Sequence, residues 1–292
     1  MLLLDRAFET ARKKNYKIVF PEKDDQRILD AAKFLTKEKL AEIVWLENTR
    51  ITSSHLATIK KQRPNIKNSI AEKLLMKPLY LAGAVLSLGQ ADAMIAGAMN
   101  STKRVIEAVS LTVGITKKLN HHSSYFLMVS PNGSEYIFAD CAVNSLMSEE
   151  ILHDISISAA AIADKLLGYS KLALLSFSTL ASGEGESVRM VRNVTESLVK
   201  KGIQAYGPIQ ADAALSREIA EMKGIEHSGD LNVLIFPSLD AGNIAYKLCQ
   251  SLGNFKSIGP FLQGFNKPVC DLSRGATTED IISASVLTLA SI

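Results

Sequence analysis

The chain has 292 residues, of which 47% are hydrophobic and 22% charged, with a net charge of +3. This length is typical of about two domains, and the balanced charge argues against disorder and against a dedicated nucleic-acid-binding protein. Three cysteines without CxxC spacing argue against a disulfide scaffold or zinc site and indicate a reducing, cytoplasmic compartment. No apolar stretch reaches the roughly 20 residues of a membrane helix, so we expect no membrane partner.

The first part of the chain alternates between short apolar runs and amphipathic segments. The apolar runs predict strands at Lys17–Pro21, Ile43–Leu46 and Ala93–Ala96. The amphipathic segments predict helices at Asp25–Glu38, Ile70–Leu75, Pro78–Leu88 and Thr102–Val113. Proline is favoured in a first helical turn and glycine at a helix C-terminus, so Pro78 and Gly89 support the bounds of the third of these helices.

A hairpin is predicted in the middle of the chain. Ser124–Val129 and Tyr136–Asp140 are strand-like runs, and Pro131-Asn132-Gly133 between them is a turn sequence. Two strands joined in this way are antiparallel, so we expect a mixed rather than a purely parallel sheet.

The alternation continues to the C-terminus. Further helices are predicted at Ile151–Leu167, Glu186–Lys201, Ala213–Met222, Gly242–Gly253 and Thr278–Leu289. Further strands are predicted at Leu172–Phe177, Ala205–Gln210, Val233–Phe236, Lys256–Phe261 and Val269–Leu272. Helices alternating with short strands predict a three-layer α/β/α fold, and the end of the hairpin region predicts a domain boundary after Leu146.

Four predicted strands end in polar segments rich in small residues. They are Gly97–Thr102, Ser176–Thr179, Pro237–Asn243 and Asp271–Gly275. Ligands of α/β proteins collect at the carboxyl ends of strands, where hydroxyls, loop amides and helix N-termini suit phosphate and carbonyl oxygens. Because the chain has neither GxxxxGK[ST] nor GxGxxG, nucleotide-binding loops of those two kinds are disfavoured.

The last of these segments places a hydroxyl, Ser273, beside a guanidinium, Arg274. Asp280 follows six residues later, near the start of the last predicted helix. Thr277 and Asp280 fit a capping box, so capping and catalysis are equally compatible with the spacing of Asp280. Cys141 follows a buried strand and is interpreted as a small hydrophobic residue rather than a nucleophile.

Several stretches of the chain resemble the phosphate acetyltransferase (phosphotransacetylase) family. They include ADAMIAGAMNST at 91–102, FADCAVN at 138–144, NVLIFPSLDAGNIAYK at 232–247 and DLSRG at 271–275. The resemblance implies a two-domain α/β fold like that of isocitrate and isopropylmalate dehydrogenases, with the active site in the cleft between domains. On this basis the first domain spans 1–146 and is completed by 263–292, and the second spans 147–262.

The reaction implied by the resemblance is acetyl phosphate + CoA ⇌ acetyl-CoA + phosphate. Coenzyme A is then a substrate, and no tightly bound cofactor or metal is expected. Members of the family are commonly homodimers, so the resemblance also implies a homodimer. In the implied catalytic set Asp280 is the base for the CoA thiol, Ser273 stabilises the transition state and Arg274 binds the phosphoryl group. The implied substrate-binding residues are Thr102, Arg104, Lys61, Ser178, Thr179, Asn243 and Tyr246.

Two departures from the family pattern bear on activity. Lys61 and Glu107 stand where the family carries arginines. Arg104, one helical turn before Glu107, could supply the missing cation, or Glu107 could pair with Arg274 and occupy the phosphate subsite. The alternatives to acetyl transfer are therefore transfer of propionyl or butyryl groups, or a non-catalytic paralogue that binds CoA or acyl phosphate.

Overall fold

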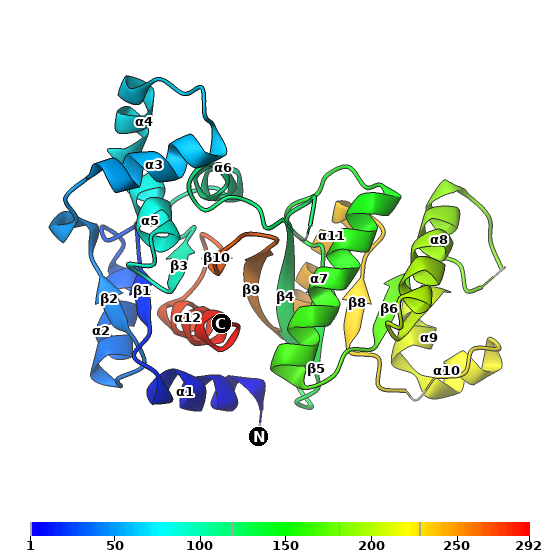
Figure 1. Cartoon of the computed structure of the whole chain (residues 1–292). Coiled ribbons are helices and arrows are strands. Elements are labelled where there is room, and N and C mark those ends of the chain that lie inside the picture. The colour runs from blue at the N-terminus through cyan, green and yellow to red at the C-terminus, as the bar shows by residue number, and fades with distance from the viewer. Residues whose placement is uncertain (1, 118, 181, 228) are drawn as a thin grey trace. The chain divides into compact units, whose positions relative to one another are not determined.

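The computed structural model describes residues 2–117, 119–180, 182–227 and 229–292. Two compact units are present (Figure 1). Unit 1 comprises Met1–Leu119 and Ile258–Ile292, and unit 2 comprises Asn120–Ser257. The C-terminal segment therefore belongs to the same unit as the N-terminal segment.

The sheet of unit 1 has the strand order β2-β1-β3-β10-β9. Its strands are β1 (Lys17–Val19), β2 (Glu42–Val44), β3 (Ala93–Ala96), β9 (Lys256–Gln263) and β10 (Val269–Asp271). The pairs β1–β2, β1–β3 and β3–β10 are parallel, whereas β9 is antiparallel to β10. The parallel strands end at one edge of the sheet, which places the loops after β1, β3 and β10 together.

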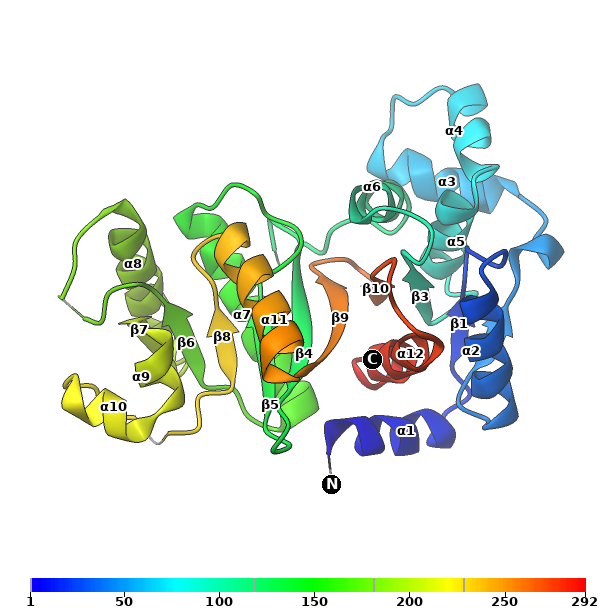
Figure 2. The ribbon, with the colours of Figure 1, turned by 180° about the vertical axis from the view of Figure 1, so that it is seen from behind.

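Helices cover both faces of this sheet. One face carries α1 (Leu3–Lys13), α2 (Gln26–Lys37) and α12 (Thr278–Ala290), and α12 packs against both of the others (Figures 1 and 2). The other carries α3 (Ser53–Gln62), α4 (Asn68–Leu75), α5 (Pro78–Ser87) and α6 (Thr102–Thr112), and the short helix η1 (Leu46–Asn48) lies after β2.

The sheet of unit 2 has the order β4-β5-β8-β6-β7. Its strands are β4 (Ser123–Val129), β5 (Glu135–Ala139), β6 (Leu172–Leu175), β7 (Ala205–Ile209) and β8 (Val233–Ile235). β4 and β5 form the predicted antiparallel hairpin, and the remaining pairs are parallel. The prediction of mixed sheets is thus confirmed in both units.

The helices of unit 2 also lie on two faces. α7 (Glu149–Leu167) and α8 (Glu186–Lys200) pack together on one face, and α11 (Leu239–Gly253) lies on the other (Figures 1 and 2). The short helices α9 (Ala211–Leu215) and α10 (Arg217–Met222) follow β7. Each unit therefore has the predicted three-layer α/β/α build.

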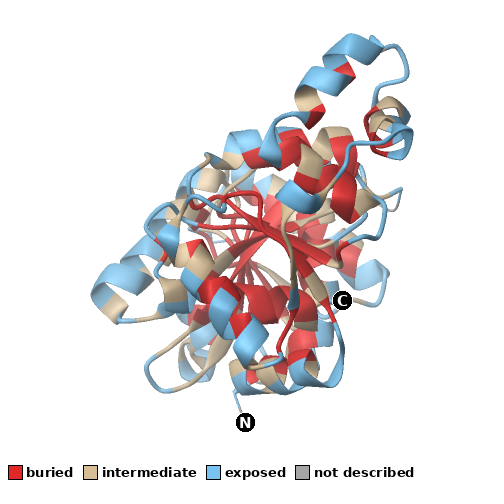
Figure 3. Ribbon diagram, turned by 90° about the vertical axis from the view of Figure 1, so that its left-hand side faces the viewer, coloured by how far each residue is buried: buried red, intermediate tan, exposed pale blue. Residues whose placement is uncertain are grey.

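The core of each unit is its sheet. The residues of β3, β6 and β8 are all buried, and the helices bury the sides that face the strands (Figure 3). The strands read as continuous apolar runs because helices cover both faces of each sheet.

Two expectations differ from the structure. The single helix expected over Ala213–Met222 is two helices, because Ser216 has extended backbone angles and its hydroxyl accepts a hydrogen bond from the amide of Ile219. The hairpin, expected in the first domain, lies in unit 2, because β5 pairs with β8 of that unit. The change of unit therefore falls after Leu119, not after Leu146.

Candidate active site

The loops after β3 and β10 lie side by side in unit 1. Asp271, the last residue of β10, is paired with Ala96, the last residue of β3. The loop after β3 leads into α6 at Thr102, and the loop after β10 leads into α12 at Thr278. We call residues 97–102 and 271–280 together the strand-end cluster.

Glu22, which follows β1, fixes the first of these loops. Its carboxylate is buried and accepts hydrogen bonds from the backbone amides of Ala98, Met99 and Asn100, at 2.8, 3.0 and 2.9 Å. The side-chain amide of Asn100 donates a fourth, at 2.7 Å. Four hydrogen-bond donors compensate the buried carboxylate, so Glu22 fixes the conformation of the loop after β3.

Arg27, in the first turn of α2, joins the two loops. Its guanidinium donates to the carbonyl oxygens of Arg274 (2.9 Å), Ala276 (2.6 Å) and Ala98 (3.3 Å). Asp25 holds the guanidinium through an ion pair of 2.6 Å, and this hydrogen bond is the main reason that the pKa of Asp25 is lowered. Arg27 therefore positions the backbone that carries Ser273 and Arg274.

Ser273 and Arg274 are both exposed. Only the carbonyl of Arg274 is used by Arg27, and within the described ranges its guanidinium has no hydrogen-bond or ion-pair partner. The hydroxyl of Ser273 accepts a hydrogen bond of 3.3 Å from the amide of Gly275. The cluster thus presents a free fork of donors, which matches the geometry of a phosphoryl group.

Asp280 is exposed and occupies the predicted capping box. Its Oδ2 accepts hydrogen bonds from the amide (2.9 Å) and hydroxyl (2.8 Å) of Thr277, and the amide of Asp280 donates to that hydroxyl at 3.2 Å. The capping interpretation is confirmed, but it engages one carboxylate oxygen only. In the part of the chain that the structure describes, Oδ1 has no hydrogen-bond partner and remains available to accept a proton.

Three of the implied substrate-binding residues also belong to unit 1. Thr102 is the first residue of α6, and its hydroxyl donates to Oδ2 of Asp271 at 2.5 Å. Arg104 is exposed in the same helical turn, and its role as the missing cation stays a prediction. Lys61 is exposed in the last turn of α3.

The other four implied binding residues belong to unit 2 and are engaged within it. Ser178 and Thr179 are buried; the Ser178 hydroxyl is 3.2 Å from that of Ser182, and Thr179 donates to Oε1 of Gln210 at 3.1 Å. The first contact lies within the loop after β6, and the second joins this loop to the residue after β7.

Asn243 and Tyr246 of α11 pack against the hairpin side of unit 2. Asn243 donates to the carbonyl of Cys141 at 3.0 Å, and Tyr246 stacks on Phe126 with ring centroids 4.2 Å apart. Cys141 is fully buried, and burial raises the pKa of its thiol well above the ordinary value. Its interpretation as a hydrophobic residue is confirmed.

Glu107 does not pair with Arg274. No ion pair between them is present in the described ranges, and Glu107 instead acts on Tyr80 of α5. Burial, followed by the charge and hydrogen bond of Glu107, raises the pKa of Tyr80. The expected ion pair of Glu107 with Arg274 is therefore not formed among the described residues, and the place of Glu107 near the phosphate stays a prediction.

The structure assigns positioning roles to three residues for which the sequence suggested none. Glu22, Arg27 and Asp271 all act on the strand-end cluster through contacts between segments far apart in the sequence. Their signal in the sequence is slight: Glu22 and Arg27 follow a predicted strand, and Asp271 ends one.

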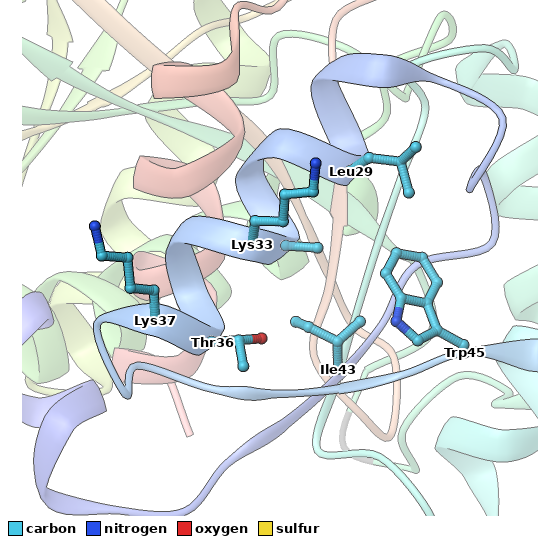
Figure 4. Close-up of a pocket in the computed structure, with 7 residues that line it drawn as sticks. Leu29, Lys33, Thr36, Lys37, Ile43 and Trp45 are labelled. Atoms are coloured by element: carbon cyan, nitrogen blue, oxygen red, sulfur yellow. The ribbon is translucent and has the colours of Figure 1, made fainter.

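A cavity of about 520 Å³ lies elsewhere in unit 1, between α2 and the segment containing β2. The amino groups of Lys33 and Lys37 point away from Ile43 and Trp45 (Figure 4). The cavity is lined by Leu29, Ala32, Lys33, Thr36, Lys37, Ile43 and Trp45, none of which was expected in the site.

Among the described residues, no cluster of three or more histidine, cysteine or carboxylate side chains suits a metal ion. None of the helices in these residues combines the length and apolar character that crossing a membrane requires.

The sequence matches the profile of one protein family, "Phosphate acetyl/butaryl transferase", over residues 2–67 and 47–289. It is 34% identical to a phosphate acetyltransferase of Clostridium acetobutylicum over 327 aligned positions, covering 99% of this chain and 98% of that protein.

Two solved structures are similar to nearly the whole of this chain. A phosphotransacetylase from Streptococcus pyogenes has a TM-score of 0.90 at 33% identity, covering 99% of this chain and 97% of that one. A 4-hydroxythreonine-4-phosphate dehydrogenase from Klebsiella pneumoniae has a TM-score of 0.51 at 12% identity, covering 99% and 86%, and shares the fold alone. The predicted likeness to a dehydrogenase fold is consistent with this match.

Proposed function

This chain belongs to the phosphate acetyl/butaryl transferase family, and we propose that it is a phosphate acetyltransferase that moves an acetyl group reversibly between coenzyme A and phosphate. The observation that carries the proposal is the match to phosphate acetyltransferases over nearly the whole chain. The guanidinium of Arg274, which is exposed and has no partner among the described residues, supports it.

The chemistry requires three tasks. The CoA thiol loses its proton, its sulfur attacks the acyl carbon of acetyl phosphate, and the tetrahedral intermediate expels phosphate with the electrons of the broken C–O bond. Asp280 accepts the thiol proton, which on ordinary pKa values is uphill by about 6 kcal/mol. A cation beside the sulfur reduces this cost because it stabilises the thiolate.

Arg274 and Ser273 supply the remaining interactions. The fork of Arg274 binds phosphoryl oxygens bidentately, and its charge favours departure of phosphate. The Ser273 hydroxyl donates a hydrogen bond to the oxyanion that develops at the acyl carbon. The attack is direct, so no acyl-enzyme intermediate forms, and the buried Cys141 takes no part.

The direct test is formation of acetyl-CoA from acetyl phosphate and CoA by the purified protein, with the reverse reaction followed as phosphate-dependent release of CoA. Turnover in both directions supports the proposal. Binding of CoA without turnover of any acyl phosphate would instead support a non-catalytic CoA-binding paralogue. A panel of acetyl, propionyl and butyryl phosphate identifies the preferred acyl group.

Glu107→Arg is expected to raise kcat/KM for acetyl phosphate by about tenfold, or about 1.4 kcal/mol, because a carboxylate near the phosphate opposes binding and a guanidinium favours it. Steady-state kinetics measures the effect. Glu107→Gln removes the negative charge while adding none, and we expect an intermediate value. Unchanged kcat/KM in both variants would show that position 107 has no influence on the phosphoryl group.

We also propose that the protein is a homodimer and that α11 forms the contact. Ile244, Leu248 and Leu252 lie four residues apart on this helix and are 57%, 52% and 79% exposed. Residues at this spacing form one apolar stripe, which a second copy of the chain would cover.

Leu248→Glu is expected to convert the dimer to a monomer, because it places a charge at the centre of this stripe. Sedimentation velocity measures the change. Val199→Glu on α8 is the matched control, since Val199 is also about half exposed, at 53%, but lies outside the stripe. A Leu248→Glu protein that still sediments as a dimer contradicts the assignment of α11.

We propose a cytoplasmic location and assign the two units as the domains of the enzyme. All three cysteines, Cys141, Cys249 and Cys270, are free thiols, as is usual in reducing compartments.

A further inference from the structure

Three acidic side chains are buried in the ranges that the structure describes: Glu22, Asp140 and Asp271. Glu22 has four hydrogen-bond donors, as described above. Asp140 accepts from the hydroxyl of Ser124 and from backbone and side-chain amides of 142–144. Both carboxylates are therefore compensated in the ionised form.

Asp271 differs from the other two. Its Oδ2 accepts one hydrogen bond, from the hydroxyl of Thr102, and its Oδ1 is the carboxylate oxygen that is buried without a partner among the described residues. An ionised carboxylate with one donor and an orphaned oxygen is expensive to bury. The neutral acid is less costly to bury, and its proton can be donated to the oxygen that Thr102 presents.

The position of this carboxyl is fixed. A Cβ atom on Gly97 would lie 2.5 Å from Oδ1 of Asp271, and Gly97 has a φ of +107°, so the loop approaches the carboxyl as only glycine allows. Thr102 is half-buried. Its hydroxyl thus connects the buried carboxyl to the accessible side of the strand-end cluster.

Few ionisable groups face Asp271. Glu22 is the nearby charge, the Cys270 thiol precedes it on β10, and β3 alongside contributes only apolar residues. Arg27 of α2 contacts both loops but donates to their backbone carbonyls rather than to Asp271. The surroundings therefore favour the protonated acid.

We propose that Asp271 is a positioning residue whose protonation state decides whether the Thr102 hydroxyl donates or only accepts a hydrogen bond at the strand-end cluster. When Asp271 is protonated, it donates to Oγ1 of Thr102 and frees the threonine proton for an oxygen of the phosphoryl group. When Asp271 is ionised, Thr102 donates inward and turns only lone pairs towards the anion. This inference rests on the proposed function.

The direction of the pH effect follows from the geometry. Burial, and then the charge of Glu22, raise the pKa of Asp271 to about 7, against the opposing effect of the Thr102 hydrogen bond. The productive form is therefore present below neutral pH and is lost as the pH rises through about 7. The protonated fraction falls by about fivefold between pH 7 and pH 8 and by about tenfold for each pH unit above that.

Asp271→Asn tests the proposal because asparagine keeps the shape but has no charge at any pH. We expect the ratio of kcat/KM for acetyl phosphate, variant over wild type, to be constant at acidic pH, to rise by about fivefold between pH 7 and pH 8, and to rise by about tenfold between pH 8 and pH 9. The ratio cancels the ionisation of the substrates and of Asp280. Asp92→Asn, directly before β3, is the matched control and should give a constant ratio.

The role of Thr102 requires its own variants. In Thr102→Val, kcat/KM for acetyl phosphate should no longer depend on the protonation of Asp271 near neutral pH. In Thr102→Ser, which keeps a hydroxyl, this pH dependence should be present again. A transition that persists in Thr102→Val would show that the charge of Asp271 acts without the hydroxyl, and a constant ratio for Asp271→Asn would overturn the proposal altogether.

A measurement without catalysis separates this inference from the proposed function. Because the pKa of Asp271 is raised in the folded state, the folded protein holds a proton that the unfolded chain releases, and wild type loses stability as the pH rises from about 4 to about 7. The Tm of Asp271→Asn should therefore increase relative to wild type over this range. A wild type that is inactive but shows this Tm difference refutes the proposed function, whereas an active wild type without it refutes the inference.

Discussion

Arg274→Ala is expected to lower kcat/KM for acetyl phosphate by about a hundredfold to a thousandfold, the usual cost of removing a donor aimed at a developing charge. The guanidinium of Arg274 has no partner in the described structure, so its removal breaks no internal contact. Arg27 donates to the Arg274 carbonyl, which alanine retains. The loss of activity should therefore come without a change in Tm.

Two further variants sharpen this result. Arg274→Lys keeps the charge but loses the bidentate fork, so we expect it to recover part of the activity. Arg12→Ala removes an exposed arginine of α1, 3.7 Å from Glu38, and should leave kcat/KM unchanged. If Arg274→Ala turned over acetyl phosphate at the wild-type rate, the assignment of Arg274 to the phosphoryl group would be wrong.

Elements with strong local signals were predicted well from the sequence. Pro78 is at the start of α5, and Gly168 ends α7 in the left-handed conformation, as their sequence positions indicate. The turn at Pro131-Asn132-Gly133 joins β4 to β5. In these cases the residue that determines the backbone angles lies within the element itself.

Elements with weak or competing signals were missed. α1 buries Leu3 with two alanines, and α3 buries Ile59 with His55 and Thr58, so neither has the large apolar stripe by which a helix is found in a sequence. Ser216 breaks a helix that the apolar pattern continues through, because a serine able to cap the next helix competes with continuation.

In the candidate site, too, the local contact was predictable from the sequence and the long-range contacts were not. The capping box of Thr277 and Asp280 is a contact over three residues, and its spacing alone predicts it. The bonds from Arg27 to Ala276 and from Thr102 to Asp271 join residues that are 249 and 169 positions apart. Such contacts depend on strand order, which no local pattern specifies, and so the three positioning residues became visible only in the structure.

Asp280→Asn is expected to lower kcat by about a hundredfold to ten-thousandfold, the usual contribution of a general base. The amide oxygen of asparagine can still accept from the amide and hydroxyl of Thr277, so the variant removes the proton acceptor and keeps the cap. The decline of the rate towards acidic pH, which reports protonation of the base, should disappear from the pH profile of the residual activity.

Thr277→Ala is the matched counterpart, because it removes the capping hydroxyl and leaves the Asp280 carboxylate. The loss of such a cap costs about 1 kcal/mol, which corresponds to a fall in Tm of about 2–4 °C, while kcat stays within a few-fold of wild type. The two variants thus separate the roles that the sequence leaves equal: base catalysis predicts a large fall in kcat for Asp280→Asn alone. If Thr277→Ala lost activity and Asp280→Asn kept it with an unchanged pH profile, Asp280 would serve the enzyme as a helix cap and the thiol proton would pass to another group.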